Sequence, residues 1–273
     1  MPELSVIVTN YKNPEVFKLC LNSLKKTLAG IESEVFLLDA EADEDTEYAA
    51  KEYGSGFVYI PFKKNVGFPA LVNEGLGRVS GKYVLILNSD SIQTEGALGK
   101  MIDCLKNNPA VGIVAPKLLN LDGSVQDSCL RFFGPLTIVA RRTFFGKTRW
   151  GKRLIEKFLM KDFDHNSTLE VDWVLGSAMM VRAEAIKKIG PMDKKFFMYF
   201  EDVDWCRRFW QNGYKVLYLP EAQIYHYHFR VSKKSGGILD LLINKYTWIH
   251  IQSAVKYYWK YKGRSTPKPF RVG

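Results

Sequence analysis

The chain has 273 residues, of which 47% are hydrophobic and 14% aromatic, a composition that excludes a disordered protein and predicts a packed globular core. Its formal net charge of +10 favours partners that carry phosphate: nucleic acid, an anionic membrane face or a nucleotide. Four scattered cysteines without a Cys-x-x-Cys pair exclude the usual zinc and redox motifs and favour reduced thiols in the cytoplasm.

Apolar, β-branched runs alternate with helical patterns over the first 117 residues. The strands are predicted at residues 4–9, 34–38, 57–60, 83–87 and 111–115, and the helices at 15–28, 43–53, 69–79 and 96–106. This βαβα order predicts an α/β fold with a mostly parallel sheet sandwiched by helices. The chain enters its first strand without a basic or long apolar leader, so we expect no signal peptide. No apolar run reaches the roughly 18 residues that a membrane span needs.

Polar residues follow three of the predicted strands. They are Thr9, Asn10 and Tyr11 after the first strand, Asp39 after the second, and Asn88, Ser89 and Asp90 after the fourth. Ligands of such sheets bind beyond the carboxyl ends of the strands, so these side chains are expected to share a site. Asp90 has the oxygen ligands that a divalent cation shares with a diphosphate. Each of these segments taken alone also fits a purely structural role. Residues 88–90 could form a β-turn, and Asp39 could be a helix N-cap or a loop acid.

The second half of the chain has a weaker pattern. Residues 118–169 are rich in basic and aromatic residues and are predicted to be an irregular insertion. Residues 171–182 are predicted to form two short strands bent at Gly176, and residues 214–219 the last strand. A long terminal helix is predicted over residues 237–261, with aromatic residues among lysines.

Three carboxylates, Glu201, Asp202 and Asp204, lie between large aromatic residues. Carboxylates held against an apolar wall are typical of a general base with a tuned pKa. The alternative is an acidic first turn that favours the helix dipole. His226 and His228 are predicted just after the last strand, where a spacing of two places both on one face of an extended segment. They are candidate metal ligands, with a packed histidine as the alternative.

Several segments, taken in order, resemble the family-two inverting glycosyltransferases, and above all their rhamnosyltransferase-like branch. They are SVIVTNY at 5–11, Asp39, NVGF at 65–68, LNSD at 87–90, VLGSAMMVR at 174–182 and FFMYFEDVD at 196–204. The resemblance implies a GT-A fold with a nucleotide-sugar-binding half (1–117), an acceptor-binding and catalytic half of the same domain (118–235) and a C-terminal helical extension (236–273).

The resemblance also implies a role for each matching residue. The residues that would bind the nucleotide sugar are Thr9, Asn10, Tyr11, Asp39, Asn65, Gly67, Asn88 and Asp90. Asp90 would also hold Mn²⁺ or Mg²⁺ together with His226 or His228, of which His226 is favoured. Asp202 would be the catalytic base, supported by Glu201 and Asp204. Trp173 and Gly176 would border the acceptor sugar.

Two positions depart from the family pattern. Asn88 replaces the first aspartate of the family's DxD signature, which keeps an oxygen ligand but removes a charge. Ala40 stands where the family has asparagine, and this change weakens the expected contact to the nucleobase of the donor.

The expected function is inverting transfer of a sugar from a nucleotide diphosphate sugar to a hydroxyl of a glycan or lipid-linked acceptor, in cell-surface polysaccharide synthesis. The alternatives are a catalytically inactive sugar-nucleotide-binding module and, from net charge, a nucleic-acid-binding protein, for which no motif is present. The basic-aromatic insertion and residues 245–262 also fit peripheral contact with the inner face of the cell membrane. A helix that packs its aromatics and exposes its lysines explains the second segment equally well.

Overall fold

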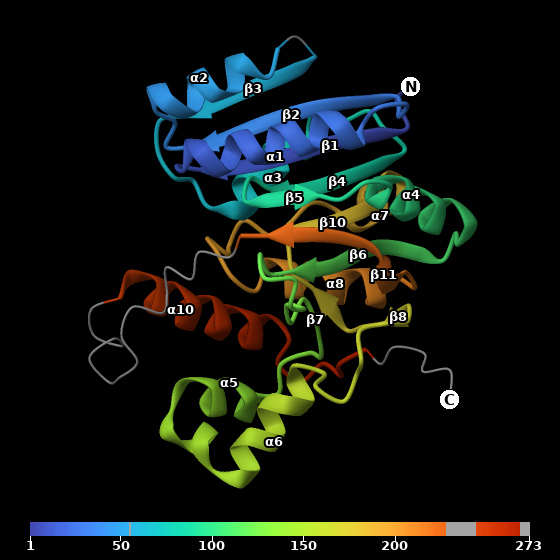
Figure 1. The fold of residues 1–273 in the computed structure, drawn as a ribbon. Coiled ribbons are helices and arrows are strands. Elements are labelled where there is room, and N and C mark those ends of the chain that lie inside the picture. Colours follow the sequence, from blue (N-terminus) through green and yellow to red (C-terminus); the bar gives the residue numbers. More distant parts are fainter. Residues whose placement is uncertain (55, 228–243, 268–273) are drawn as a thin grey trace.

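The computed structural model describes residues 1–54, 56–227 and 244–267, and within them nine strands form one mixed sheet (Figure 1). The strand order is β3-β2-β1-β4-β10-β6-β11-β5, with β8 (Leu169–Glu170) paired to β11 away from this path. Helices cover both faces of the sheet in Figure 1. The predicted α/β sandwich with a mostly parallel sheet is therefore confirmed.

The first half of the chain forms the parallel part of the sheet. Its strands are β1 (Leu4–Tyr11), β2 (Ser33–Ala40), β3 (Phe57–Phe62) and β4 (Tyr83–Asn88). Side chains alternate across this sheet. Val6 and Val8 therefore pack in one core cluster with α1 (Pro14–Thr27), α2 (Glu44–Glu52) and α4 (Ala97–Asn107). Ile7 points to the opposite face, where α3 (Phe68–Leu76) packs.

The second half adds strands of both directions. β10 (Ala178–Arg182) is antiparallel to β4 on one side and to β6 (Val111–Leu119) on the other. β11 (Lys215–His226) runs parallel to β6, and β5 (Ser91–Gln93) pairs antiparallel with the end of β11. A separate ladder joins β7 (Cys129–Leu130) to β9 (Trp173–Val174). The bend predicted at Gly176 lies between β9 and β10, as expected.

Three helices pack in the second half of the chain. They are α7 (Ala183–Ile189), α8 (Glu201–Gln211) and α10 (Lys245–Lys260). Val203 and Tyr257 belong to the same core cluster as Ile86 of β4, so α8 and α10 share one continuous core with the sheet. All four cysteines are free. Among the described residues, no helix combines the length and apolar character that crossing a bilayer requires.

The structure corrects several sequence predictions. The insertion predicted to be irregular contains α5 (Pro135–Arg142), the 3₁₀ helix η1 (Phe144–Lys147) and α6 (Arg149–Phe158). Both α-helices are amphipathic, α6 strongly so, but their many basic residues make the segment polar overall. β11 continues to His226, past the predicted end at residue 219, because its pairing with β6 shifts register between Leu219 and Gln223 and then resumes. α7 was not predicted, and the part of the terminal helix predicted at 237–243 lies outside the described residues.

Candidate active site

The carboxyl ends of β1, β2 and β4 bring the predicted nucleotide-binding residues together. Asn10 and Asp39 are paired in the β1–β2 register, and the Asn10 amide donates to Asp39 Oδ1 at 2.8 Å. The Thr9 hydroxyl donates to Asn88 Oδ1 at 3.1 Å. Tyr59 of β3, which sequence reasoning missed, donates its hydroxyl to Asp39 Oδ2 at 2.8 Å. These bonds hold the fully buried Asp39 carboxyl in one orientation.

The backbone at this edge is strained. Lys12, Asn13 and Glu41 all have positive φ values, of 59°, 65° and 56°, directly after β1 and β2. Non-glycine residues adopt this conformation at a cost of about 1 kcal/mol or more, and such residues gather at functional sites. Lys12 and Glu41 form an ion pair of 3.3 Å between the two strand ends, beside the half-exposed Tyr11.

The loop before α3 rests on the segment that leads into the acidic run. Asn65 Oδ1 accepts a hydrogen bond from the Gly67 N–H at 2.9 Å, and the Phe68 N–H donates to the Phe197 carbonyl at 3.0 Å. Gly67 has a φ of 87°, and a Cβ there would collide with the Phe197 carbonyl oxygen. Only glycine fits this position, so the predicted binding loop and the base-bearing segment are held in direct contact.

Asp90 and His226 meet at the edge of the sheet. β5 follows Asp90 directly and pairs with β11, so His226 lies opposite Ser91, with its Nε2 3.3 Å from Asp90 Oδ1. The Gln126 amide nitrogen donates to the His226 carbonyl (2.7 Å) and to Asn120 Oδ1 (2.9 Å), which turns Gln126 Oε1 toward the ring. Gln126 Oε1 lies 2.9 Å from His226 Nδ1 and can only accept, so Nδ1 carries the proton.

This arrangement fits a divalent cation. With the proton of a neutral His226 on Nδ1, the Nε2 lone pair and Asp90 Oδ1 face each other, and both are electron-pair donors. Asp90 Oδ1 is buried and has no hydrogen-bond partner among the described residues. A cation bound by both His226 Nε2 and Asp90 Oδ1, or a proton on Nε2, would remove the repulsion between their lone pairs. Within the described part of the chain, no cluster of three or more His, Cys, Asp or Glu adds further ligands to this pair.

The other sequence candidates around this position behave differently. The side-chain oxygen of Asn88 accepts a hydrogen bond from the Thr9 hydroxyl. Two further buried polar atoms near the strand ends, Asn10 Oδ1 and Ser177 Oγ, have no hydrogen-bond partner among the residues that the structure describes. Buried polar groups are nearly always paired, so such atoms are typical of a site that receives a polar ligand. His228 lies outside the described residues.

Asp202 is held at the beginning of α8 by an unusual turn. Tyr199 and Phe200 both have a φ of 69°, two consecutive non-glycine residues in the left-handed region. The Asp202 carboxylate accepts hydrogen bonds from the N–H groups of Gly176 (3.2 Å) and Val203 (2.8 Å). Burial raises the pKa of Asp202 to about 6, against the opposing effect of these two donors. A carboxyl with this pKa is ionised at neutral pH and yet basic enough to accept a proton.

A two-residue stretch of backbone links this carboxylate to the strand-end tripeptide. Gly176 donates to Asp202, and the carbonyl of the next residue, Ser177, accepts from the Asn88 N–H at 2.8 Å. A Cβ on Gly176 would lie 2.9 Å from the Phe68 ring, so the absence of a side chain lets the binding loop and the base approach each other. The candidate base and the candidate nucleotide site therefore form one constellation.

Glu201 is buried beside Asp202, with an exposed fraction of 5%. Its Oε2 has no hydrogen-bond partner within the described part of the chain. Burial, followed by the charge of Asp202, raises the pKa of Glu201 well above its ordinary value. The negative charge of Asp202 therefore disfavours ionisation of Glu201.

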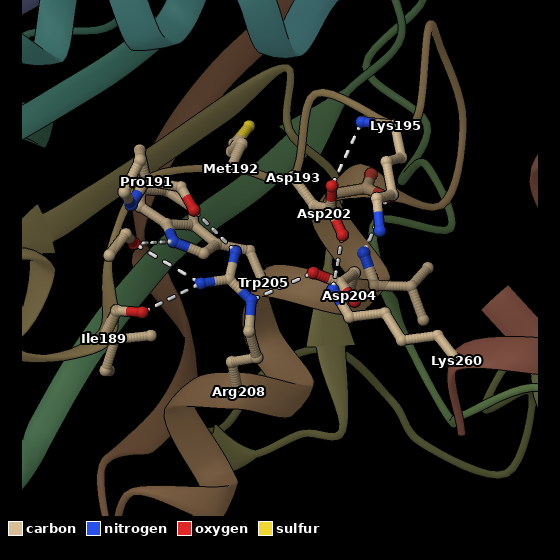
Figure 2. A network of polar contacts seen from close by, with 12 residues as sticks. Ile189, Pro191, Met192, Asp193, Lys195, Asp202, Asp204, Trp205, Arg208 and Lys260 are labelled. Carbon is tan, nitrogen blue, oxygen red and sulfur yellow. Dashed lines mark hydrogen bonds and ion pairs between the residues drawn. The ribbon is translucent and has the colours of Figure 1, made fainter. Parts of the chain in front are cut away.

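Asp204 has a different environment, shown in Figure 2. Its fully buried carboxylate bonds to Arg208 Nε (2.9 Å), Lys260 Nζ (2.7 Å) and the Tyr261 hydroxyl (2.8 Å). Lys260 also bonds to Asp193 at 2.7 Å. These partners occupy both oxygens, so Asp204 joins α8 to α10 and is not placed to exchange a proton with a substrate.

Trp173 is also more enclosed than the sequence suggested. Its side chain is 5% exposed, its indole N–H donates to the Arg131 carbonyl at 2.8 Å, and its ring stacks on Phe133. The prediction that it touches an acceptor does not fit this burial, because the apolar ring is used to fill the core behind β9. Gly176, by contrast, lies directly beside Asp202.

Comparisons with known proteins agree with this geometry. The family model described as "Glycosyltransferase like family 2" matches residues 2–243. The N-acetylglucosaminyl-diphospho-decaprenol L-rhamnosyltransferase of Mycobacterium tuberculosis is 24% identical over 242 residues, which cover 83% of this chain and 76% of that protein. The rhamnosyltransferase WbbL of Escherichia coli K12 is 29% identical, over 66% of this chain and 65% of that protein.

Solved structures share the fold. The Staphylococcus aureus TarS fragment 1–349 has a TM-score of 0.57 at 16% identity, over 82% of this chain and 60% of that one. GalNAc-T7, solved with UDP, GalNAc and Mn²⁺, has a TM-score of 0.59 at 12% identity, over 84% of this chain and 43% of that one. The chain thus spans less than two thirds of either structure, and the likeness confirms the expected GT-A fold. Because the family model matches residues 2–243 of the 273, the protein belongs to the glycosyltransferase like family 2 and is a glycosyltransferase.

Proposed function

We propose that this glycosyltransferase moves a sugar, a hexose or deoxyhexose, from a nucleotide diphosphate sugar to a hydroxyl of a glycan or lipid-linked acceptor, with inversion at the anomeric carbon. The supporting observation is the short backbone connection from Asp202 through Gly176 and Ser177 to Asn88. It sets the candidate base next to Ser177, whose buried Oγ has no hydrogen-bond partner among the described residues, and close to the end of β4. The relatives that carry rhamnosyltransferase names favour cell-surface polysaccharide synthesis as the setting.

In this proposal the donor lies across the ends of β1, β2 and β4. Thr9, Asn10, Tyr11 and Asp39 bind the nucleoside, and Asn65, Gly67 and Asn88 line the same pocket. Asp90 and His226 would hold Mn²⁺ or Mg²⁺, which when bound would supply positive charge near the diphosphate. Gln126 fixes the His226 tautomer in which the proton is on Nδ1 and Nε2 lies opposite Asp90.

Asp202 performs the proton transfer. Its carboxylate accepts the proton of the acceptor hydroxyl as the hydroxyl oxygen attacks the anomeric carbon from the face opposite the diphosphate. A single displacement of this kind inverts the configuration. Burial and the neighbouring negative charge of Asp202 raise the pKa of Glu201 well above its ordinary value, so the base role is assigned to Asp202.

A lipid-linked acceptor would be met at a membrane. We therefore propose that the enzyme works as a peripheral protein on the inner face of the cell membrane, in line with the basic and aromatic character of residues 135–158 and 245–264.

Donor turnover tests the proposed function. A panel of nucleotide diphosphate sugars is incubated with Mn²⁺ or Mg²⁺, and release of the nucleotide diphosphate is measured for the wild type, Asp202→Asn and, as a matched control, the exposed Asp122→Asn. Release that requires both the metal and Asp202 supports the transferase. Binding of a donor without any release, with added glycan acceptors present, would instead favour an inactive sugar-nucleotide-binding module.

A further inference from the structure

α10 has two different long faces. Its inner face bonds to the segment that precedes the candidate base: the Ser253 hydroxyl donates to the Met198 carbonyl (2.9 Å), and Lys256 Nζ donates to the Lys195 carbonyl (2.8 Å). Tyr257 on the same face is buried in the core. This inner face therefore holds α10 against the segment that leads into α8.

The outer face of α10 carries exposed apolar side chains. Trp248, Val255 and Trp259 have exposed fractions of 49%, 51% and 73%. Their spacings of seven and four residues put them on one stripe of a helix with 3.6 residues per turn. Lys262 Nζ lies 5.4 Å from the Trp259 ring, so positive charge borders this stripe. Packing among the described residues (1–54, 56–227 and 244–267) does not cover this stripe.

A second exposed apolar set lies on the hairpin formed by α5, η1 and α6. It consists of Leu136, Val139, Phe144 and Trp150. Figure 1 shows the hairpin projecting from the body of the protein on the same side of the sheet as α10. The Phe133 carbonyl, just before α5, lies 3.5 Å from the Tyr258 hydroxyl of α10. The hairpin and α10 are thus neighbouring elements.

The charge of the whole chain is concentrated in these two segments. Residues 135–158 contain seven basic residues and one acid, and residues 245–264 contain five basic residues and no acid. Their net charge is +11, whereas the rest of the chain has 27 basic and 28 acidic residues and a net charge of −1. Within the segments, Lys256 and Lys260 bond inward, whereas Arg149, Lys152 and Arg153 on α6 are exposed.

We propose that the outer stripe of α10 and the α5–η1–α6 hairpin together form a surface that binds an anionic lipid bilayer. Tryptophan favours the boundary between headgroups and acyl chains, and lysine and arginine are attracted to anionic headgroups. A nucleic acid would use the charge but not the exposed aliphatic residues. The proposal deepens the proposed function, because α10 would bring the lipid end of an acceptor beside the segment that carries Asp202.

Co-sedimentation with vesicles tests the surface directly. The full chain is mixed with vesicles of phosphatidylcholine alone or with 30% phosphatidylglycerol (about a third of the lipid). We expect binding only to the anionic vesicles, and release at high salt. Lys152→Gln/Arg153→Gln should weaken binding roughly 30-fold, since each basic residue contributes about a factor of five. Trp248→Ser/Trp259→Ser should weaken it roughly tenfold or more.

Matched controls lie on α1. Lys25→Gln/Lys26→Gln removes two exposed charges, and Leu19→Ser an apolar side chain that is 54% exposed; both should bind like the wild type. Failure of the wild type to sediment with anionic vesicles, or equal weakening by the control variants, would overturn the proposal. So would a dimer, detected by light scattering, that Trp248→Ser/Trp259→Ser abolishes, because a second chain would then cover the surface.

Donor turnover without vesicles separates this proposal from the proposed function. Both surface variants should keep wild-type melting temperatures and metal-dependent release of nucleotide diphosphate, since the substituted side chains are exposed and belong to neither the candidate base nor the nucleotide site. An enzyme that binds vesicles but turns over no donor would contradict the proposed function alone.

Discussion

The backbone N–H of Gly176 lies 3.2 Å from the Oδ2 of Asp202, in the bend between β9 and β10. This hydrogen bond fixes the direction of the candidate base and favours its ionised form, while burial favours the protonated form. Burial is the larger effect. The net effect of burial and hydrogen bonding is a carboxyl that accepts a proton near neutral pH. It is held by the same backbone bend that bonds to Asn88.

Gly176→Ala should disturb this relationship. The added Cβ would lie 2.9 Å from the Phe68 ring and 3.7 Å from the Asp202 Cβ, so either the ring or the bend must shift. A displacement of the base by a fraction of an ångström lowers turnover, here by roughly tenfold or more. Gly99→Ala is the control, since a Cβ at that position of α4 has no neighbour within 4 Å and should leave turnover unchanged. Equal kcat values for the two variants would contradict a positioning role.

Turnover should depend on pH through Asp202. The base acts in its ionised form, so kcat is expected to rise as pH increases through about 6 and to level off above it. Below this pH the carboxyl is protonated, and kcat should fall about tenfold per pH unit. A pH profile of nucleotide diphosphate release, with donor saturating, measures the midpoint. A midpoint near 4, the ordinary value for aspartate, would mean that burial does not control this group.

Asp202→Asn should make the protein more stable near neutral pH. Because the folded-state pKa is raised from 3.8 to about 6, the folded protein holds a proton that the unfolded chain releases, so stability falls as pH rises through this window. The loss is at most about 3 kcal/mol above pH 6, and less because the side chain is partly exposed. Asparagine does not ionise, so the Asp202→Asn variant does not lose this stability. Urea denaturation at pH 7.5 should show the gain, and at pH 3.5 the difference should vanish; a destabilised variant at pH 7.5 would contradict the reasoning.

Gln126→Leu should weaken metal binding without removing a metal ligand. Its carboxamide oxygen accepts from His226 Nδ1 and so keeps Nε2 directed at the Asp90 carboxylate. Loss of such an outer partner typically costs 10- to 100-fold in metal affinity. Mn²⁺ titration followed by electron paramagnetic resonance, with nucleotide diphosphate present, measures the change. Gln211→Leu, at the exposed end of α8, should match the wild type.

The strands and most helices were predictable because their buried apolar residues recur with the period of a strand or of a helix. β1 and β4 are nearly continuous apolar runs that end in polar residues, and those ends marked the site. The hairpin of α5 and α6 was missed although α6 is strongly amphipathic, because its high content of basic residues resembles that of an exposed loop. The end of β11 was missed because pairing with β6, not local sequence, carries the strand past residue 219.

The three acids of α8 show where sequence reasoning stops. Pattern alone placed Glu201, Asp202 and Asp204 together, but their environments come from residues far away in the chain. Asp204 is paired with Lys260 and Tyr261, some 57 positions later, whereas Asp202 receives the N–H of Gly176. Tyr59 and Gln126 were missed for the same reason, because their roles depend on the side chains they meet across the sheet.

The central claim is that Asp202 is the base of a single displacement. It is tested most directly by measuring donor affinity and sugar transfer together for Asp202→Asn, with a nucleotide diphosphate sugar that the wild type turns over. The amide keeps the shape of the side chain, so donor affinity measured by calorimetry should stay within about threefold. Transfer should fall by about 10² to 10⁴. Transfer within a factor of a few of the wild type, at unchanged donor affinity, would contradict the claim.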